Sequence, residues 1–382
     1  MKTFEEINEK IQKGNAVVAT AEEILDIVGD MGMRETAEYV DVVTTATFGP
    51  MCSTGAFLNF GHADPPIRME KIVLNNVNIC AGLAAVDGYI GATEISDDLG
   101  IEYGGAHLIC DLIDGKKVRL QAFGKGTDCY PRQEIDTYIT LDSINEAYMF
   151  NPRNCYQNYA AAANTSDKEL YTYMGVLQPG LGNVNYSTTG ELSPLLNDPY
   201  LRTIGMGTKI FLGGTVGYVS WQGTQFVTEK PRGENGVPLS GAATLALIGD
   251  LKDMSTEFIQ PAVFEGYGTS IYVGVGIPIP VLDVELLENL IVKNKDIYQY
   301  IVDYSKDGKP ALGSCSYEEL RSGEVVLEGK TVKTAPLSSL YKSKKIAQML
   351  KSWIIKGEFT LQEPIKRFPK VEALKSLKVR NS

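Results

Sequence analysis

An apolar run followed at once by a long irregular stretch constrains this fold more than any other feature of the chain. Residues 40–47 (VDVVTTAT) are rich in β-branched residues, which favour strands. Residues 49–68 (GPMCSTGAFLNFGHADPPIR) then carry glycines and prolines that interrupt regular structure. The pattern predicts a strand that ends in a large loop, and this loop holds Cys52, His62, a carboxylate and Arg68.

A second thiol has a similar setting. Residues 117–123 are predicted to form a strand, and the loop that follows, residues 123–132 (FGKGTDCYPR), carries Cys129. Functional groups concentrate in loops at strand ends. Lys125 and Arg132 lie near Cys129 in sequence, and nearby cations favour a thiolate. These features leave a reactive and an inert role equally open for both loop thiols.

Composition and charge exclude several classes of function. The chain has 382 residues and a net charge of −11, which disfavours nucleic-acid binding. The N-terminus lacks the apolar core of a signal peptide, and no apolar run reaches the roughly 18 uninterrupted residues that a membrane-spanning helix needs. We therefore expect a cytoplasmic protein with reduced thiols and with neither nucleic-acid nor membrane partners.

The cysteines and histidines do not form a local metal motif. None of the six cysteines forms a C-x-x-C pair, the spacing typical of zinc ribbons and ferredoxin-type clusters. His62 and His107 are the two histidines, and each fits either an acid–base group or a satisfied structural histidine. We predict no metal site. Cys80 and Cys110 lie in apolar runs and are predicted to be core residues.

The order of predicted elements indicates a mixed α/β (α+β) fold. We expect one large domain over residues 1–360, with mixed sheets, glycine-rich loops and flanking helices, and a C-terminal tail over residues 361–382. Helices are predicted over residues 3–13, 20–29, 33–39, 142–150 and 284–304, and at the start of 340–375. Strands are predicted over residues 16–20, 40–47, 72–79, 117–123 and 135–141 and within 102–113, while of the apolar runs 242–251 and 270–281 one is expected to be a strand and the other a helix.

Two further patterns concern ligands. Residues 177–193 are rich in Gly, Asn, Ser and Thr, and small polar residues with exposed amides predict a binding loop that includes Asn183 and Asn185. Three Gly-x-Gly-Thr segments, at 124–127, 205–208 and 266–269, fit either anion-binding amides or plain tight turns. None of them extends to a nucleotide-binding motif, so we infer no nucleotide site.

Three segments together resemble the homocysteine biosynthesis family. They are residues 49–62 (GPMCSTGAFLNFGH), 104–107 (GGAH) and 126–131 (GTDCYP), and the resemblance covers about residues 10–360. It implies incorporation of sulfur into L-aspartate semialdehyde to form L-homocysteine, with Cys52 and Cys129 as the family's two cysteines. Many archaeal members also carry a C-terminal pair of CBS domains. This sequence ends before such a pair, so we expect that regulatory layer to be absent.

The resemblance also implies a mechanism with two thiols. Converting an aldehyde and sulfide into a thiol is a two-electron reduction with loss of water, and the sequence has no flavin, nicotinamide or iron–sulfur motif. We therefore expect no cofactor on this chain, and electrons from an iron–sulfur (ferredoxin-like) partner. One cysteine would carry a persulfide, and the other would resolve it or hold the aldehyde carbon. The Cα atoms of Cys52 and Cys129 should then lie within about 7 Å.

The substrate's groups suggest further roles under this resemblance. Arg68 would bind the carboxylate, residues 183–186 would take the ammonium, and His62 or His107 would protonate the departing hydroxyl. The full predicted substrate-binding set is Ser53, Asn59, Arg68, Lys125, Arg132, Asn183 and Asn185. The same residues also fit a surface salt bridge, a turn and satisfied histidines.

Two other classes of protein stay open. The chain fits a scaffold or sulfur carrier whose cysteines share an iron–sulfur cluster with a ferredoxin-like partner. It also fits a cysteine-nucleophile acyl or aldehyde enzyme without a redox step. A homo-oligomer is compatible with each of them. Stoichiometric iron in anaerobically purified protein would favour the scaffold.

Overall fold

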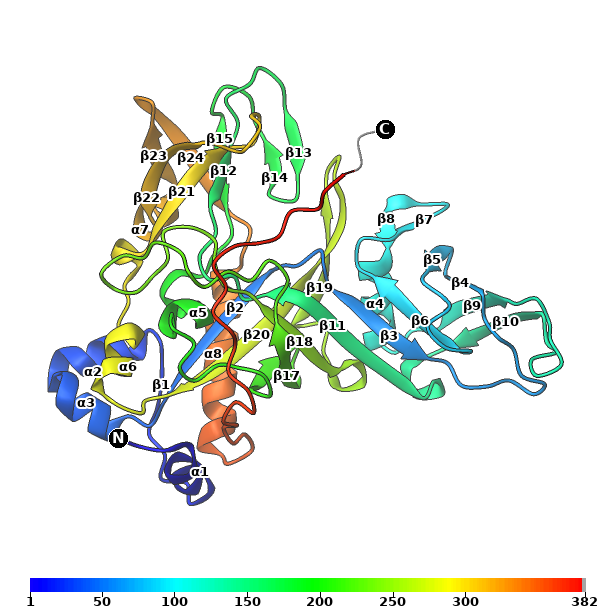
Figure 1. Ribbon diagram of the computed structural model, residues 1–382, viewed down its shortest axis with the longest axis horizontal. Helices are drawn as coiled ribbons and strands as arrows, with labels where there is room; N and C mark the ends of the chain where they lie inside the picture. The colour runs from blue at the N-terminus through cyan, green and yellow to red at the C-terminus, as the bar shows by residue number, and fades with distance from the viewer. Residues whose placement is uncertain (380–382) are drawn as a thin grey trace.

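The computed structural model describes residues 1–379, and a ten-stranded sheet forms its centre (Figure 1). The strand order is β1-β2-β20-β16-β17-β18-β11-β3-β6, and β19 pairs with β20. The strands are β1 (Val18–Thr20), β2 (Val42–Pro50), β3 (Gly55–Asn59), β6 (Asp87–Gly91), β11 (Glu146–Asn154), β16 (Lys209–Leu212), β17 (Thr215–Gln222), β18 (Leu245–Asp250), β19 (Ile259–Phe264) and β20 (Gly268–Pro280). The pair β1–β2 is parallel, whereas β2 and β20 form a long antiparallel ladder.

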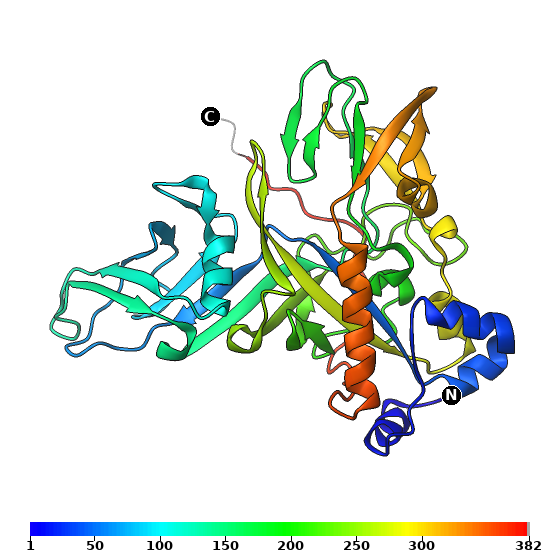
Figure 2. The same cartoon turned by 180° about the vertical axis from the view of Figure 1, so that it is seen from behind.

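Helices cover the part of this sheet that contains the N-terminal strands β1 and β2. They are α1 (Phe4–Gln12), α2 (Glu23–Met31), α3 (Met33–Tyr39), α6 (Val284–Leu290) and α8 (Leu340–Ile355). Helix α8 lies across β2 and β20, as Figure 2 shows from behind. Glycines make this close approach possible, because a Cβ atom on Gly274 would lie 2.9 Å from Ile346. Strand β2 is therefore buried along almost its whole length, which explains why its sequence does not alternate between apolar and charged residues.

Residues 71–139 contribute a second, six-stranded sheet that extends from the centre as an arm (Figure 1). Its order is β10-β9-β4-β5-β7-β8. The strands are β4 (Lys71–Leu74), β5 (Val77–Ile79), β7 (Ile95–Ser96), β8 (Gly100–Gly104), β9 (Val118–Phe123) and β10 (Glu134–Ile139), and helix α4 (Gly105–Ile113) packs between this sheet and β19. The loop between β9 and β10 lies at the outer end of the arm.

A third sheet stands on the other side of the centre, with the order β22-β21-β12-β15-β24-β23. Its strands are β12 (Ala161–Ala163), β15 (Asn183–Tyr186), β21 (Tyr298–Asp303), β22 (Ala311–Ser316), β23 (Glu324–Leu327) and β24 (Lys330–Pro336), with the separate hairpin β13 (Leu170–Thr172) and β14 (Gly175–Leu177) beside it. The remaining short helices are α5 (Pro194–Asn197), α7 (Tyr317–Arg321), η1 (Leu141–Ser143), η2 (Gly190–Leu192), η3 (Leu251–Asp253) and η4 (Asn294–Asp296).

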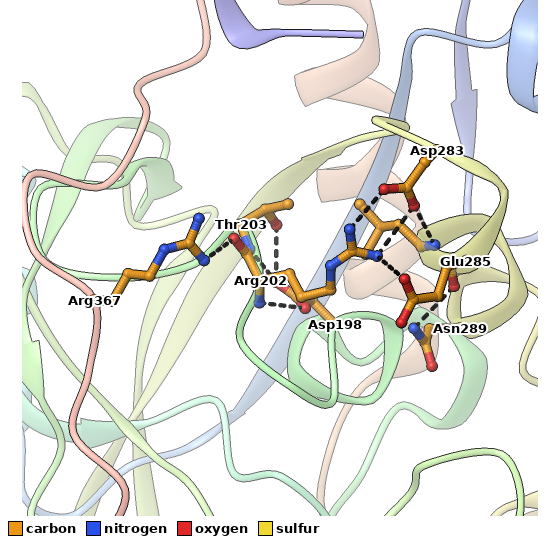
Figure 3. A network of polar contacts seen from close by, with 8 residues as sticks. Asp198, Arg202, Thr203, Asp283, Glu285, Asn289 and Arg367 are labelled. Atoms are coloured by element: carbon orange, nitrogen blue, oxygen red, sulfur yellow. Dashed lines mark hydrogen bonds and ion pairs between the residues drawn. The ribbon is translucent and has the colours of Figure 1, made fainter. Parts of the chain in front are cut away.

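The chain after α8 packs against the central sheet. The Lys366 ammonium lies over the Trp221 ring, and Phe368 packs edge-on against Phe226. Figure 3 shows how Arg202 ties this segment to α6: its guanidinium donates to both oxygens of Asp283, at 3.1 and 2.6 Å, while its carbonyl accepts from Arg367. The domain boundary at residue 360 stays a prediction, and tail residues 380–382 lie outside the described residues.

The mixed α/β fold is confirmed, and several elements are as predicted. Helix α1 lies in its predicted range and begins with a capping box, in which Thr3 and Glu6 bond each other's backbone. Strands β1, β2, β9 and β10 and helices α2, α3 and α8 also lie in their predicted ranges. Within residues 1–379, no helix has both the length and the apolar character needed to cross a membrane.

Six predictions of local structure are wrong. Residues 55–59, which were predicted to lie in a loop, form β3, and residues 72–79, which were predicted as one strand, form β4 and β5. Residues 105–113 form α4 and not a strand, because a continuous apolar run does not distinguish a buried helix from a strand. Residues 146–154 form β11, whose side chains alternate between buried and exposed, and not a helix. Both apolar runs, 242–251 and 270–281, supply strands. The helix predicted over 284–304 ends at Leu290 and is followed by η4 and β21.

Candidate active site

Cys52 lies in a tight turn between β2 and β3 at the centre of the molecule. The Met51 N–H donates to the Ile271 carbonyl at 2.7 Å, and the Thr54 hydroxyl donates to the Met51 carbonyl at 2.8 Å. Asn151 of β11, which is fully buried, donates to the Thr54 hydroxyl at 2.9 Å. Because β20 and β11 both bond to this turn, the half-buried Cys52 thiol has a fixed position.

This thiol faces a cavity of about 300 Å³. The cavity lies where the central sheet meets the β13–β14 hairpin, and its lining is mainly aromatic and polar. The lining residues are Pro50, Met51, Cys52, Ser53, Arg153, Tyr156, Tyr159, Tyr173, Met174, Ser187, Gln225, Phe264, Tyr267, Ser270 and Leu337. A thiol, a guanidinium and several phenols in one small cavity are typical of a binding site for a small polar molecule.

Two buried polar atoms of the lining have no hydrogen-bond partner among residues 1–379. They are Nε of Arg153 and Oγ of Ser270. Arg153 also makes no ion pair within the described residues. A buried donor left unpaired costs about 1–3 kcal/mol, so such atoms usually mark the place of a ligand or water. The Arg153 N–H is therefore suited to an anionic group inside the cavity.

Four residues form a hydrogen-bond network on one wall of the cavity. The Tyr173 oxygen accepts from Tyr159 at 3.2 Å, from Tyr304 at 3.0 Å and from the Lys309 ammonium at 3.2 Å. Burial acts to raise the pKa of Tyr173, but these hydrogen bonds and the lysine charge outweigh burial and lower it. The pKa values of Tyr159 and Tyr304 are both raised, chiefly by burial. Of these three phenols, Tyr173 therefore has the lowest pKa and loses its proton most readily.

Cys52 also raises the pKa values of two other tyrosines. Burial raises the pKa of Tyr267, and the adjacent Cys52 sulfur raises it further. Burial raises the pKa of Tyr156 to about 12, while nearby Arg153 opposes this and Cys52 adds to it. Both phenols therefore stay protonated beside the thiol at neutral pH and are available as hydrogen-bond donors.

Cys129 lies elsewhere, so the prediction that the two thiols meet within one chain is wrong. Cys129 is exposed in the loop between β9 and β10, at the outer end of the arm, whereas the Cys52 turn is central (Figure 1). The extended strand β3 separates the Cys52 turn from the segment near residues 62–67 against which the Cys129 loop packs. Five residues of strand span about 16 Å, so no disulfide forms in this arrangement.

Neither histidine lines the cavity. His62 is exposed and stacks on Tyr130 beside the Cys129 loop, with ring centroids 6.2 Å apart. His107 lies in the first turn of α4, where its Nδ1 accepts the Gly104 N–H at 3.2 Å, and burial lowers its pKa. The structure therefore places His107 as a structural cap, and His62 in the arm.

The predicted cationic ligands also lie outside the cavity. Arg68 is exposed, Lys125 pairs with Glu70 at 3.6 Å, and Arg132 donates to the carbonyls of Asp64 and Pro65. These contacts hold the arm's outer loops together.

Of the four uncharged polar residues that were predicted to bind the substrate, one lies in the cavity. Ser53 lines it, 3.5 Å from the Asn151 amide oxygen. Asn59 bonds to Asp87 on a neighbouring strand. Asn183 and Asn185 belong to β15, not to a loop, and donate to backbone carbonyls of the β13–β14 hairpin. They position the hairpin that carries Tyr173.

Among the other cysteines, one prediction is confirmed and one is wrong. Cys110 is buried, and burial raises its pKa to about 12. Cys80 is exposed, because it follows the buried Ile79 at the end of β5 and successive side chains point to opposite faces.

Comparison with known proteins places this chain in a family. Residues 16–361 match the family described as "Homocysteine biosynthesis enzyme, sulfur-incorporation". The chain belongs to this family. A Methanosarcina acetivorans protein named L-aspartate semialdehyde sulfurtransferase is 50% identical over 99% of this chain and 74% of its own length. A Methanocaldococcus jannaschii protein of the same name is 49% identical over 97% of this chain and 74% of its own length. No solved structure matches the chain significantly.

The sequence analysis missed most residues of the cavity of this homocysteine biosynthesis enzyme. Arg153, Tyr156 and Tyr159 lie in a stretch that is rich in Asn, Tyr and Ala, and Tyr267 lies in the third Gly-x-Gly-Thr segment. The composition of these segments was the available signal. It did not indicate which tyrosines share a wall, because they come from distant parts of the chain.

Proposed function

We propose that this chain incorporates sulfide-derived sulfur into L-aspartate semialdehyde and forms L-homocysteine. One observation carries the proposal: a single small cavity combines the Cys52 thiol with the unpaired Arg153 N–H and several protonated phenols. The names of the two relatives with about half of their residues identical support the same substrate.

The groups of the cavity suit the three polar ends of this substrate. The Arg153 guanidinium would accept the carboxylate, since charge-assisted bonds from arginine are strong and directional. The faces of Tyr156 and Tyr159, whose ring centroids lie 4.8 Å apart, would receive the ammonium. The aldehyde carbon would then lie toward Cys52. In this assignment Arg153 takes the role that the sequence suggested for Arg68.

The overall reaction consumes the aldehyde, hydrogen sulfide, two electrons and two protons, and yields the thiol and water. Sulfur adds to the aldehyde carbon, water leaves, and the resulting carbon–sulfur double bond is reduced. Two thiols can supply these two electrons by forming a disulfide, but a single thiol cannot. Within residues 1–379, Cys52 is the one cysteine that lines the cavity. We therefore propose that the Cys52 thiol adds to the aldehyde carbon as a thiohemiacetal. Hydrogen sulfide then replaces first the hydroxyl, which leaves as water, and next the Cys52 thiol, which leaves the carbon–sulfur double bond. An iron–sulfur, ferredoxin-like protein delivers the two electrons singly.

For Cys129 we propose a role in the encounter with a partner protein. Its thiol is exposed beside Tyr130 and His62, so a protein that carries sulfur or electrons reaches it without entering the cavity. This role replaces the pairing of Cys129 with Cys52, which the separation of the two loops does not support.

The decisive experiment is a reconstituted reaction under anaerobic conditions. Purified protein is incubated with L-aspartate semialdehyde, sulfide and a low-potential one-electron reductant, and homocysteine is measured by mass spectrometry. We expect homocysteine from the wild type and none from Cys52→Ser. Growth of a homocysteine auxotroph that carries the gene gives an independent readout. Absence of homocysteine with every reductant tried would contradict the proposal.

Iron analysis of the same sample separates the enzyme from the scaffold. In the part of the chain that the structure describes, no three His, Cys, Asp or Glu side chains are grouped so as to hold a metal ion. A protein that forms homocysteine while containing no iron is an enzyme that needs only an external donor. Stoichiometric iron that is lost in Cys52→Ser would favour the scaffold.

A further inference from the structure

Three hydrogen-bond donors converge on one phenolic oxygen at the cavity wall. Tyr159, Tyr304 and Lys309 all lie within 3.2 Å of the Tyr173 oxygen. A neutral phenol has two acceptor sites and one proton of its own to give. Three donors therefore satisfy a phenolate better than they satisfy a phenol.

Separate segments hold each member of this arrangement in place. Tyr173 lies in the turn of the β13–β14 hairpin, which Asn185 fixes by donating to the Met174 carbonyl at 2.7 Å. Tyr304 directly follows β21. The Lys309 ammonium lies over the Tyr304 ring, 3.9 Å from its centroid, and so reaches the Tyr173 oxygen from the solvent side. The three donors therefore come from two segments outside the hairpin that carries Tyr173.

We propose that Tyr173 is the acid–base group of the cavity, and that Tyr159, Tyr304 and Lys309 stabilise its oxygen whenever its proton has left. This inference rests on the proposed function for its substrate. It assigns to Tyr173 the proton transfer that the sequence analysis gave to His62 or His107, neither of which lines the cavity.

The step assigned to Tyr173 is the addition of sulfur to the aldehyde. As the sulfur forms a bond to the aldehyde carbon, the carbonyl π electrons move to oxygen, and this oxygen takes the Tyr173 proton. The phenolate then recovers a proton from the S–H group of the attacking sulfur. The products are a hydroxyl-bearing carbon–sulfur adduct and a neutral Tyr173, so atoms and charge balance and no electrons are exchanged with a cofactor.

Other titratable groups surround Tyr173, and several of them affect its pKa. Lys309 lowers the pKa of Tyr173, as do the hydrogen bonds from Tyr159 and Tyr304. Tyr267 packs edge-on against the Tyr173 ring, with ring centroids 6.1 Å apart, and the charge of Tyr173 acts to raise the pKa of Tyr156. Cys52 and Arg153 also line the cavity. Lys309 does not line the cavity, so replacing it removes a positive charge beside Tyr173 and leaves the cavity lining intact.

The first test needs no substrate. Tyrosinate absorbance is followed while the pH of the protein is raised, for the wild type, Tyr173→Phe and Lys309→Met. We expect one tyrosine of the wild type to ionise below the ordinary value of about 10. This step should vanish in Tyr173→Phe and should occur at a pH about 1 higher, or more, in Lys309→Met. Tyr171→Phe is the matched control: Tyr171 is an exposed tyrosine on the same hairpin, bonded to Glu169, and its loss should leave the step unchanged.

The second test is the pH profile of homocysteine formation. The acid must be protonated, so the rate should fall as the pH rises through the Tyr173 pKa, and the fall should shift to higher pH in Lys309→Met. In Tyr173→Phe the turnover number should drop about 100-fold or more, with little change in KM. Lys309 is exposed, so Lys309→Met should fold even if Tyr173→Phe is unstable.

Each outcome decides a separate point. Near-normal turnover of folded Tyr173→Phe, or a titration in which this variant and the wild type coincide, overturns the assignment of Tyr173. A wild type that forms no homocysteine overturns the proposed function instead. The titration still decides whether Tyr173 is the tyrosine that ionises first, because it is measured without substrate.

Discussion

Two loops of this molecule look alike in sequence and differ in structure. Each follows a strand, contains glycine and proline, and carries one cysteine. The Cys52 turn is held by β20 and β11 beside a cavity in which Arg153 has an unpaired N–H. The Cys129 loop lies at the end of the arm, where the Arg132 side chain is already bonded to backbone carbonyls. What distinguishes a candidate reactive thiol is therefore the unsatisfied polar groups around it.

The largest effect should separate the two thiols. With free sulfide and a chemical reductant, Cys52→Ser should lower homocysteine formation at least about 1,000-fold, because a serine hydroxyl is a much weaker nucleophile toward the aldehyde carbon than a thiol. Cys129→Ser should stay within about threefold of the wild type in this assay and should lose activity when a protein partner supplies the sulfur or electrons. Melting temperatures check that both variants are folded. A large loss in Cys129→Ser with free sulfide would remove the distinction between the loops.

The next effect compares two arginines. Arg153→Leu should raise KM for the aldehyde about 30- to 100-fold, because a charge-assisted hydrogen bond to a carboxylate contributes roughly 2–3 kcal/mol. Arg68→Leu is the control, since Arg68 is exposed and outside the cavity, and its KM should change less than about twofold. Steady-state kinetics at fixed sulfide measures both values. Equal changes in the two variants would mean that the cavity does not bind the carboxylate.

A smaller effect concerns the wall that carries the tyrosines. Burial acts to raise the pKa of Asp303, but hydrogen bonds from Ser305 and Thr165 outweigh it and hold this pKa at about 2, below the ordinary 3.8. Stability from this group is therefore fully present above about pH 4 and is lost as the pH falls toward 2. The shift corresponds to about 2 kcal/mol.

Asp303→Asn should lower the free energy of unfolding by about 2 kcal/mol at neutral pH and should flatten its dependence on acid pH. Asp128→Asn, on the exposed loop beside Cys129, should change stability by less than about 0.5 kcal/mol. Denaturant unfolding between pH 2 and 7 tests both. An acid dependence that is unchanged in Asp303→Asn would show that another carboxylate is responsible.

The smallest effect compares two cysteines without a proposed role. Cys110 is buried between α4 and the Ile259 carbonyl, and Cys110→Ser should cost about 1–2 kcal/mol because the new hydroxyl loses water. Cys80→Ser should be neutral within about 0.5 kcal/mol, since Cys80 is exposed. Both should retain activity. Loss of activity in either variant, with stability retained, would give that cysteine a function that its position does not suggest.

Much of the local structure could be predicted because it depends on nearby residues. The capping box of α1 and the strands β2, β9 and β10 follow from spacing and from β-branched residues. The strand β11 was mistaken for a helix because Asp142 resembles an N-cap, and only the pairing of β11 with β3 and β18 selects the extended form. Cys52 was selected from its loop context together with the family resemblance, and its role stays a prediction.

The sequence by itself determined the family, the mixed α/β class and the two loop thiols. The tertiary structure decided which thiol faces a cavity and what surrounds it. Tyr156, Tyr173, Tyr267 and Tyr304 lie far apart along the chain and meet because β11, β13–β14, β19–β20 and β21 end at one place. Cys129 is kept away by β3, since an extended strand is rigid and adds about 3.3 Å for each residue. Contacts between distant segments depend on how sheets pair, and local sequence patterns do not encode that pairing.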